Sequence, residues 1–178
     1  MNLKQRHLWQ NPFRKNDPAA TLLNAWRQTP LLTGIPASVC SKLVERTHLR
    51  QYSANEYLFR EGEAGVSAAV IISGRIAICS GEHVIAELGP GDFFGESALL
   101  QDAPRSASAM ALGNASVSFL VRFQLEEFVR HRPGAGLEIM TNLARLLVAR
   151  LHRGNRGEDS DQASHLNGDL NNAGDRAP

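Results

Sequence analysis

The most informative part of this sequence is residues 88–107, which read LGPGDFFGESALLQDAPRSA. Gly95 allows the backbone to bend and to approach a ligand closely. The residues after it, 96–100, can form a short helical turn, which Pro104 ends. The free N–H groups at a helix start, together with the helix dipole, favour an anion such as phosphate. The stretch therefore predicts an anion site.

Three side chains of this stretch can complete such a site. Arg105 carries a permanently charged guanidinium that offers paired donors to phosphate oxygens. Ser106 adds a hydroxyl donor, and Glu96 is an acceptor close by. In a 3′,5′-cyclic nucleotide the 2′-hydroxyl is the only free ribose hydroxyl, so a carboxylate that accepts from it distinguishes ribose from deoxyribose. Without their neighbours, Arg105 and Glu96 are better explained as a structural ion pair.

Between residues 49 and 121 the sequence consists of short runs that are rich in β-branched and aromatic residues or alternate with period two. Turn signals such as Ser73-Gly74 and Gly89-Pro90-Gly91 separate these runs. Many short strands at close spacing predict a small sandwich or barrel. The predicted strands are 49–52, 57–59, 68–73, 75–80, 83–88, 92–94, 105–112 and 117–121.

Helical patterns flank this region. A short helix fits 20–28, and a second begins at Pro36, a residue suited to a first helical position. After the strands we predict helices over 124–130 and, beyond the break at Pro133-Gly134, over 137–151. The last helix carries a broad apolar stripe, which predicts more than one packing partner. The stripe consists of Leu137, Met140, Leu143, Ala144, Leu147 and Leu151.

The two ends of the chain differ from the middle in composition. Residues 1–18 are basic and contain Trp9 and Phe13. They are interpreted as a flexible arm that is solvated rather than bound to an acidic partner or membrane surface. Residues 153–178 are dominated by Gly, Asn, Asp and Ser, so a disordered tail is predicted there. Residues 19–152 then form one domain without net charge, long enough for a single hydrophobic core.

Charge and hydropathy exclude several classes of protein. The 178 residues carry a formal net charge of +1, and 43% of them are hydrophobic. A neutral domain lacks the basic surface that nonspecific binding to nucleic acid requires. No apolar run is long enough to span a bilayer, and the N-terminus lacks the apolar segment of a secretory signal. We therefore expect a cytoplasmic protein.

Cysteine and histidine usage indicates neither a disulfide framework nor a metal centre. Cys40 and Cys79 lie among apolar neighbours and are interpreted as reduced core thiols. None of the six histidines has a second ligand at a convincing metal-binding spacing. No Ser/His/Asp or Cys/His constellation is visible, so the sequence predicts a protein that is not an enzyme.

Residues 88–107 resemble the phosphate-binding cassette of the cyclic nucleotide-binding domain family, which includes the catabolite activator protein, the regulatory subunits of cAMP-dependent protein kinase and nucleotide-gated channels. The family pattern Gly-Asp-x-Phe-Gly-Glu-x-Ala-Leu, followed after a spacer by Pro-Arg-x-Ala, is matched by 91–99 and 104–107. Other family motifs occur in the same order, and the resemblance covers about residues 28–152. These motifs are PLLTGI at 30–35, LFREGE at 58–63 and VIISGRI at 70–76.

The resemblance implies a fold that is mainly β with flanking helices, an antiparallel β-roll of the double-stranded β-helix or jelly-roll type. It implies that Arg105 binds the cyclic phosphate and that Glu96 binds the ribose 2′-hydroxyl. It also implies backbone contacts to the ligand from Gly95, Ser97 and Ala98.

Two further implications concern base preference and the last helix. Ser106 occupies a position that is tied to phosphate contact and base preference. Serine there resembles the bacterial activator branch, which prefers cAMP, without excluding cGMP. The helix 137–151 lies over the base or pairs with its copy in a homodimer. The implied ligand is cAMP or cGMP, and no metal is implied.

The sequence departs from the family at two places. Asn55 stands where the family often has Gly, but Asn tolerates a left-handed conformation. Beyond Leu151 the sequence is polar, whereas the activator branch continues into a helix-turn-helix domain. We therefore expect a stand-alone sensor that signals through an effector protein, without direct binding to DNA. Two alternatives stay open: an activator-type transcription regulator without its own DNA-binding domain, and a scaffold whose pocket is vestigial or takes a cyclic dinucleotide.

Overall fold

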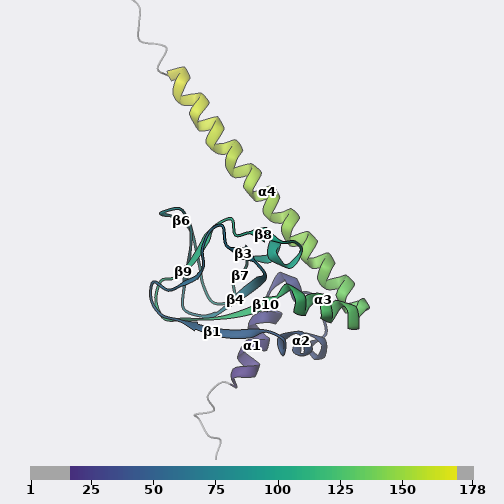
Figure 1. Ribbon diagram of the computed structural model, residues 1–178. Coiled ribbons are helices and arrows are strands. Elements are labelled where there is room, and N and C mark those ends of the chain that lie inside the picture. The colour runs from purple at the N-terminus through teal and green to yellow at the C-terminus, as the bar shows by residue number, and fades with distance from the viewer. Residues whose placement is uncertain (1–16, 172–178) are drawn as a thin grey trace, which may run out of the picture.

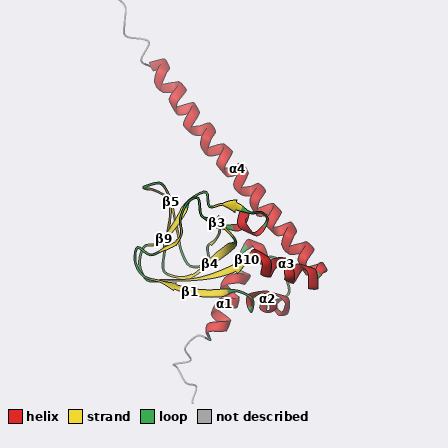
Figure 2. Ribbon diagram, in the orientation of Figure 1, coloured by secondary structure: helices red, strands yellow, loops and turns green. Residues whose placement is uncertain are grey.

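The computed structural model describes the backbone of residues 17–171 and the side chains of residues 17–152. Most of the predicted arm at 1–18 and the end of the predicted tail therefore lie outside the described residues. The strands form a roll, against which the helices pack (Figures 1 and 2). Within the described part of the chain, no helix is long and apolar enough to cross a membrane.

The described chain folds into short strands that are joined by tight turns. The strands are β1 His48–Tyr52, β2 Tyr57–Phe59, β3 Ala64–Gly65, β4 Ser67–Ser73, β5 Ile76–Ser80, β6 His83–Leu88, β7 Phe93–Phe94, β8 Ala103–Pro104, β9 Ser108–Ala111 and β10 Ala115–Val121. Two four-stranded sheets have the orders β1-β10-β4-β7 and β2-β9-β5-β6, and β3 pairs with β8. All these pairs are antiparallel, which confirms the predicted antiparallel roll.

The helices precede and follow the strands, except for one short helix between β7 and β8. They are α1 Pro18–Arg27, the 3-10 helix η1 Pro30–Leu32, α2 Ala37–Val44, the 3-10 helix η2 Glu96–Leu99, α3 Arg122–His131 and α4 Pro133–Asn171. The helices predicted at 20–28, after Pro36 and at 124–130 are thus confirmed to within a few residues. Asp17 caps α1, because its Oδ1 accepts a hydrogen bond from the Ala19 N–H at 3.0 Å.

Two clusters of buried side chains hold these layers together. One lies inside the roll, where Ile71 and Val117 are fully buried. The other lies between the roll and the helices and contains Trp26, whose ring meets Phe93 edge-on at a centroid distance of 6.0 Å. The Trp26 Nε1–H donates to Ser118 Oγ at 2.9 Å, so this buried indole has a polar partner on β10. α1 is therefore attached to the roll by packing and by a hydrogen bond.

The strand predicted at 105–112 is wrong at its start, since β9 covers only Ser108–Ala111. The backbone of Arg105 pairs elsewhere: its N–H donates to Glu63 O at 2.8 Å, and its carbonyl accepts from the Gly62 N–H at 2.9 Å. Strands β3 and β8 were not predicted, because two residues are too few for a period to be visible.

The last helix differs from the prediction at both ends. It begins at Pro133 rather than at 137. A proline is tolerated at the first position of a helix, because the N–H group that it lacks would have no partner within the first turn. Its backbone continues to Asn171, which differs from the disordered tail predicted from residue 153. A helix makes its backbone hydrogen bonds within itself, so it can extend without packing partners. Residues 172–178 lie outside the described chain.

Candidate functional site

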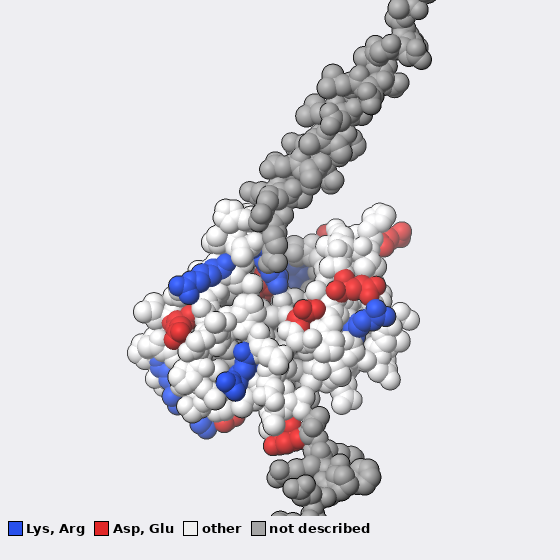
Figure 3. All heavy atoms as spheres, turned by 180° about the vertical axis from the view of Figure 1, so that it is seen from behind, with Lys and Arg blue, Asp and Glu red and all other residues white. Residues whose placement is uncertain are grey.

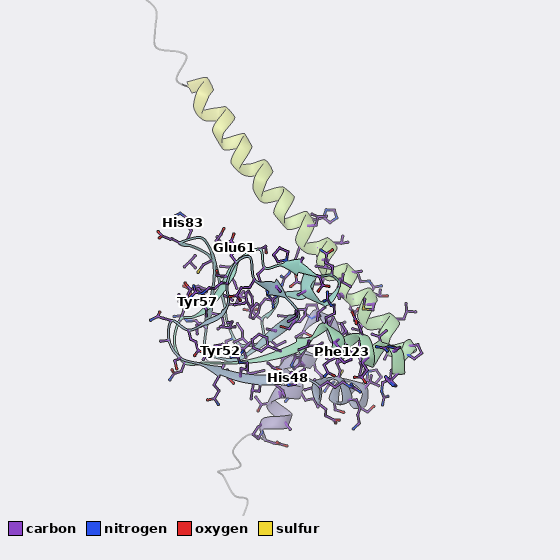
Figure 4. The ribbon with its side chains drawn as sticks, viewed as in Figure 1. His48, Tyr52, Tyr57, Glu61, His83 and Phe123 are labelled. Carbon is purple, nitrogen blue, oxygen red and sulfur yellow. The ribbon has the colours of Figure 1, made fainter. Side chains whose placement is uncertain are left out.

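A pocket of about 430 Å³ opens in the roll between the segment after β7, the β5–β6 hairpin and α4. The Gly81 N–H donates to Glu61 Oε2 at 3.2 Å, so the loop after β2 is tied to the β5–β6 turn. Figure 4 shows Glu61 and His83 at this same end of the roll. The lining residues are Phe59, Gly65, Ile78, Ala86, Leu88, Phe94, Gly95, Ser97, Ala98, Ala103, Pro104, Arg105, Ser106, Ala107 and Arg150.

Gly95 occupies a position that another residue cannot take without strain. Its φ is +72°, in the left-handed region that favours glycine. A Cβ atom there would lie 2.7 Å from Nη1 of Arg105 and 3.3 Å from the carbonyl oxygen of Ser67. The absence of a side chain at Gly95 therefore lets the guanidinium of Arg105 approach the backbone closely.

Arg105 is a cation that is held in the pocket without a carboxylate at contact distance. Its Nη2 donates to Ser67 O at 2.9 Å and lies 3.4 Å from Ser67 Oγ. Its Nε is buried without a hydrogen-bond partner among the described residues. None of the ion pairs found within residues 17–152 includes Arg105.

Burial lowers the pKa of the Arg105 guanidinium, and the charge of Glu63 opposes this shift. The direction means that the protein interior disfavours the isolated charge. An arginine stays protonated at neutral pH regardless. The pocket therefore presents a partly desolvated positive charge that has no carboxylate at contact distance.

Glu96 is placed differently from the other predicted site residues. It is 5% exposed and does not line the pocket. Nη1 of Arg150 lies 2.7 Å from each of its two carboxylate oxygens. Nη2 of Arg150 donates to the carbonyl oxygen of Phe93 at 2.7 Å. The carboxylate therefore belongs to a contact between η2 and α4.

The other predicted site residues lie together, as expected. Lining this pocket are Gly95, Ser97, Ala98, Arg105 and Ser106. η2 is a 3-10 turn whose first bond runs from the Ala98 N–H to Gly95 O at 3.2 Å. The first N–H groups of such a turn have no partner within it. The motif thus brings backbone donors, a guanidinium and a hydroxyl to the same cavity.

Sequence reasoning missed Arg150 and the apolar wall of the pocket. Arg150 stands near the end of the predicted helix 137–151, and its place on that helix was the only signal available. The wall comes from neighbouring strands, and its side chains suit a flat apolar group rather than an anion. It consists of Phe59, Ile78, Ala86, Leu88 and Phe94.

The histidines give no sign of a metal centre in the described part of the chain. No group of three or more His, Cys, Asp or Glu side chains there is arranged to hold a metal ion. His48 and His83, for example, lie at different ends of the roll (Figure 4). Cys40 and Cys79 are both buried and free, as predicted.

Comparison with known families gives a direct match to this part of the chain. Residues 49–132, which include all of the cassette and most of the roll, match the family model described as the cyclic nucleotide-binding domain. Residues 49–132 form a domain of the cyclic nucleotide-binding domain family. Domains of this family are usually regulatory rather than catalytic.

Relatives support this assignment over different lengths. A cAMP-dependent protein kinase regulatory subunit of Hypocrea atroviridis is 33% identical over 97 residues, which are 54% of this chain and 21% of that protein. A cGMP-dependent protein kinase of Plasmodium berghei is 35% identical over 75 residues, 42% of this chain and 9% of that protein. The chain therefore spans about a fifth or less of the length of these curated relatives.

A solved structure extends the match to the helices. The catabolite activator protein of Thermus thermophilus superposes with a TM-score of 0.67 at 27% identity, over 75% of this chain and 63% of that one. This cyclic nucleotide-binding domain thus has the β-roll of its family.

Proposed function

We propose that this chain binds a 3′,5′-cyclic nucleotide, cAMP in preference to cGMP, and acts as a non-catalytic sensor that passes the signal to an effector protein in the cytoplasm. One observation carries the proposal. Arg105 lines the pocket with a partly desolvated positive charge that has no carboxylate at contact distance. The absence of a side chain at Gly95 lets this guanidinium lie against the backbone. A bound phosphate would give this charge its partner.

The pocket accommodates the three parts of the ligand in order. The cyclic phosphate meets Arg105, the hydroxyl of Ser106 and the backbone of Gly95, Ser97 and Ala98. The ribose lies toward η2, beside Arg150, which lines the pocket and contacts the buried Glu96. The base lies against the apolar wall contributed by β2, β5, β6 and β7. The volume of about 430 Å³ is within the range of ordinary small-molecule sites.

The contact between Glu96 and Arg150 transmits the effect of ligand binding to α4. Glu96 does not line the pocket, so its carboxylate has to turn toward the ribose when the ligand binds. A carboxylate has about four lone-pair sites, so Glu96 can then accept from the 2′-hydroxyl while Arg150 still binds it. Arg150 then orients Glu96 for the ligand, and the ligand in turn favours the position of α4 in which that contact exists. A ligand shifts a conformational equilibrium only through such differential contacts.

The preference for cAMP rests on Ser106, which stands where the bacterial activators that this chain resembles carry a serine. The relatives include proteins named for cAMP and for cGMP, so their names alone do not favour one base. Competition between the two nucleotides for the same pocket measures the preference directly.

Isothermal titration calorimetry of the full chain with cAMP, cGMP and a cyclic dinucleotide tests the proposal. We expect the strongest binding for cAMP. Arg105→Ala should weaken it by about 10- to 100-fold, because a charge-assisted hydrogen bond contributes roughly 1.5–3 kcal/mol. Arg27→Ala, which removes an exposed arginine of α1, is the matched control. If folded protein gives no heat with any of the three ligands, the proposal is wrong and the pocket is vestigial. If only the cyclic dinucleotide binds, the proposed ligand is wrong and the cyclic dinucleotide takes its place.

A homodimer through 137–151 is a further part of the proposal. The exposed residues Leu137, Val148 and Leu151 are 70%, 53% and 63% accessible. Leu137, Ala144 and Leu151 repeat at the spacing of a heptad, which is the pattern of a helix-to-helix seam. Sedimentation velocity on wild type and on Leu151→Glu, with and without cAMP, tests it. A monomer at every concentration would contradict this part.

Direct binding to DNA is not part of the proposal. The face of the molecule in Figure 3 carries scattered Lys, Arg, Asp and Glu side chains and no continuous basic region. A transcription regulator that acts through a DNA-binding partner stays the alternative. A mobility-shift assay with a retarded band for the chain alone would contradict our proposal on this point.

A further inference from the structure

Phe59 lies face-on against the arginine of the proposed phosphate site. Cζ of Arg105 lies 4.0 Å from the centroid of the Phe59 ring, well within the distance at which a cation is attracted by the face of an aromatic ring. Both residues line the pocket. The ring is itself supported by Phe94, with the two centroids 6.2 Å apart and the planes inclined by 37°. The contact therefore joins β2 and β7 to the guanidinium.

The remaining contacts of Arg105 leave its orientation under-determined. The backbone oxygen of Ser67 accepts from Nη2 at 2.9 Å, and this hydrogen bond fixes one end of the group. Nε has no hydrogen-bond partner among the described residues. A long side chain that is held at one end alone keeps several rotamers, so something else has to restrict the guanidinium plane.

An aromatic face restricts a cation in a way that a carboxylate does not. A carboxylate would accept the same N–H groups that a phosphate needs, and it would neutralise the charge that attracts the phosphate. A ring face accepts none of these hydrogen bonds in the guanidinium plane and leaves the charge intact. A leucine of similar size fills the space but offers no such face.

We infer that Phe59 is a positioning residue for the ligand phosphate: its ring holds the guanidinium plane of Arg105 in the pocket while the full positive charge stays available to the anion. This inference rests on the proposed function, because it needs the pocket to take a phosphate. It adds Phe59 to the binding machinery, whereas the sequence identified this residue only as part of a strand and of the LFREGE family motif at 58–63.

The test compares cAMP affinities of the full chain carrying Phe59→Leu or Phe59→Tyr. We expect Phe59→Leu to weaken binding by about 2- to 30-fold, the range of an exposed to a desolvated cation–π contact. Phe59→Tyr, which keeps the face, should stay within about twofold of wild type. Phe119→Leu is the matched control, since that half-buried phenylalanine packs edge-on against Tyr52 at 6.3 Å, away from the pocket residues.

A double-variant cycle separates positioning from general packing. In an Arg105→Ala background the Phe59→Leu change should have little further effect, because the group that the ring positions is gone. An equal loss of affinity for Phe59→Leu and Phe59→Tyr, or the same loss with and without Arg105, would overturn the inference. If wild type binds no cyclic nucleotide at all, the proposed function fails first, and this outcome is distinct from the other two.

A measurement on the unmutated protein covers the case in which Phe59→Leu does not fold. The ring current of Phe59 should shift the Arg105 Nε–H proton upfield of the exposed arginines in an NMR spectrum, with the resonance assigned by its loss in Arg105→Lys. Addition of cAMP should move the same resonance downfield as the phosphate accepts from it. A resonance at the position of an exposed arginine, before and after cAMP, would contradict the inference.

Discussion

The contact between Arg150 and Glu96 allows a quantitative prediction for the variant Arg150→Ala. In wild type both carboxylate oxygens of Glu96 lie 2.7 Å from Nη1 of Arg150, so the carboxylate is fixed in one orientation. The variant leaves an almost fully buried carboxylate without this partner, free to rotate and to bind water that enters beside it. Its hydrogen bond to the ribose 2′-hydroxyl should therefore weaken.

The size of the effect follows from the hydrogen bond that is impaired. A hydrogen bond to a charged group contributes about 1.5–3 kcal/mol when it is well made. Loss of orientation removes part of this, and the Arg150 side chain is 40% exposed, so water replaces some of its role. We expect a loss of about 1–1.5 kcal/mol, or roughly 5- to 12-fold in the affinity for cAMP.

The discriminating assay is calorimetry with cAMP and with 2′-deoxy-cAMP. The deoxy analogue lacks the hydroxyl that Glu96 would bind, so Arg150→Ala should change its affinity by less than about twofold. Arg145→Ala, an exposed arginine on the same helix, is the control for general effects on α4. Equal weakening of both ligands by Arg150→Ala would refute the reasoning, because Arg150 would then act on the ligand without Glu96.

Three further predictions follow from single contacts. Gly95→Ala should lower the free energy of unfolding by about 1–3 kcal/mol and weaken cAMP binding, because residue 95 has a φ of +72° and the added Cβ would meet Arg105. Gly89 has open space around it, so the control variant Gly89→Ala should have the melting temperature of wild type. Asn142→Ala should cost about 1–2 kcal/mol in urea unfolding, because the buried amide donates to Leu31 O at 3.2 Å and Thr33 O at 2.8 Å and joins α4 to η1. Burial raises the pKa of Tyr52 above its usual 10.0, so at alkaline pH the folded state keeps a proton that the unfolded state loses. The free energy of unfolding should therefore fall as the pH rises above about 10. Tyr52→Phe should make this fall shallower in unfolding experiments at a series of pH values.

Local features of the sequence were enough for most of the fold. The predicted strands 57–59 and 83–88 have the bounds of β2 and β6, because alternation and turn residues are properties of adjacent positions. The strand at 105–112 failed because the backbone of Arg105 pairs with the 62–63 segment, and no local pattern reports that pairing. The two-residue strands β3 and β8 were missed because they are too short to show a period.

The same division holds for the site. The cassette at 88–107 predicted which residues gather around an anion, and five of the six predicted residues line one pocket. Glu96, the sixth, is buried in contact with Arg150, a residue that the motif does not contain. The roles of all six in ligand binding stay predictions, to be tested by calorimetry.

The order of short strands, the glycine turn and the arginine after it are written in residues that are neighbours in the chain, so the sequence alone was sufficient to predict them. The partners of the charged groups are a different matter. Arg105 contacts Phe59 and donates a hydrogen bond to Ser67, which is 38 residues away in the chain. Glu96 accepts a hydrogen bond from Arg150, which is 54 residues away. Such pairs depend on strand register and on where α4 packs. Only the folded chain sets these, because they result from burying two apolar clusters at once.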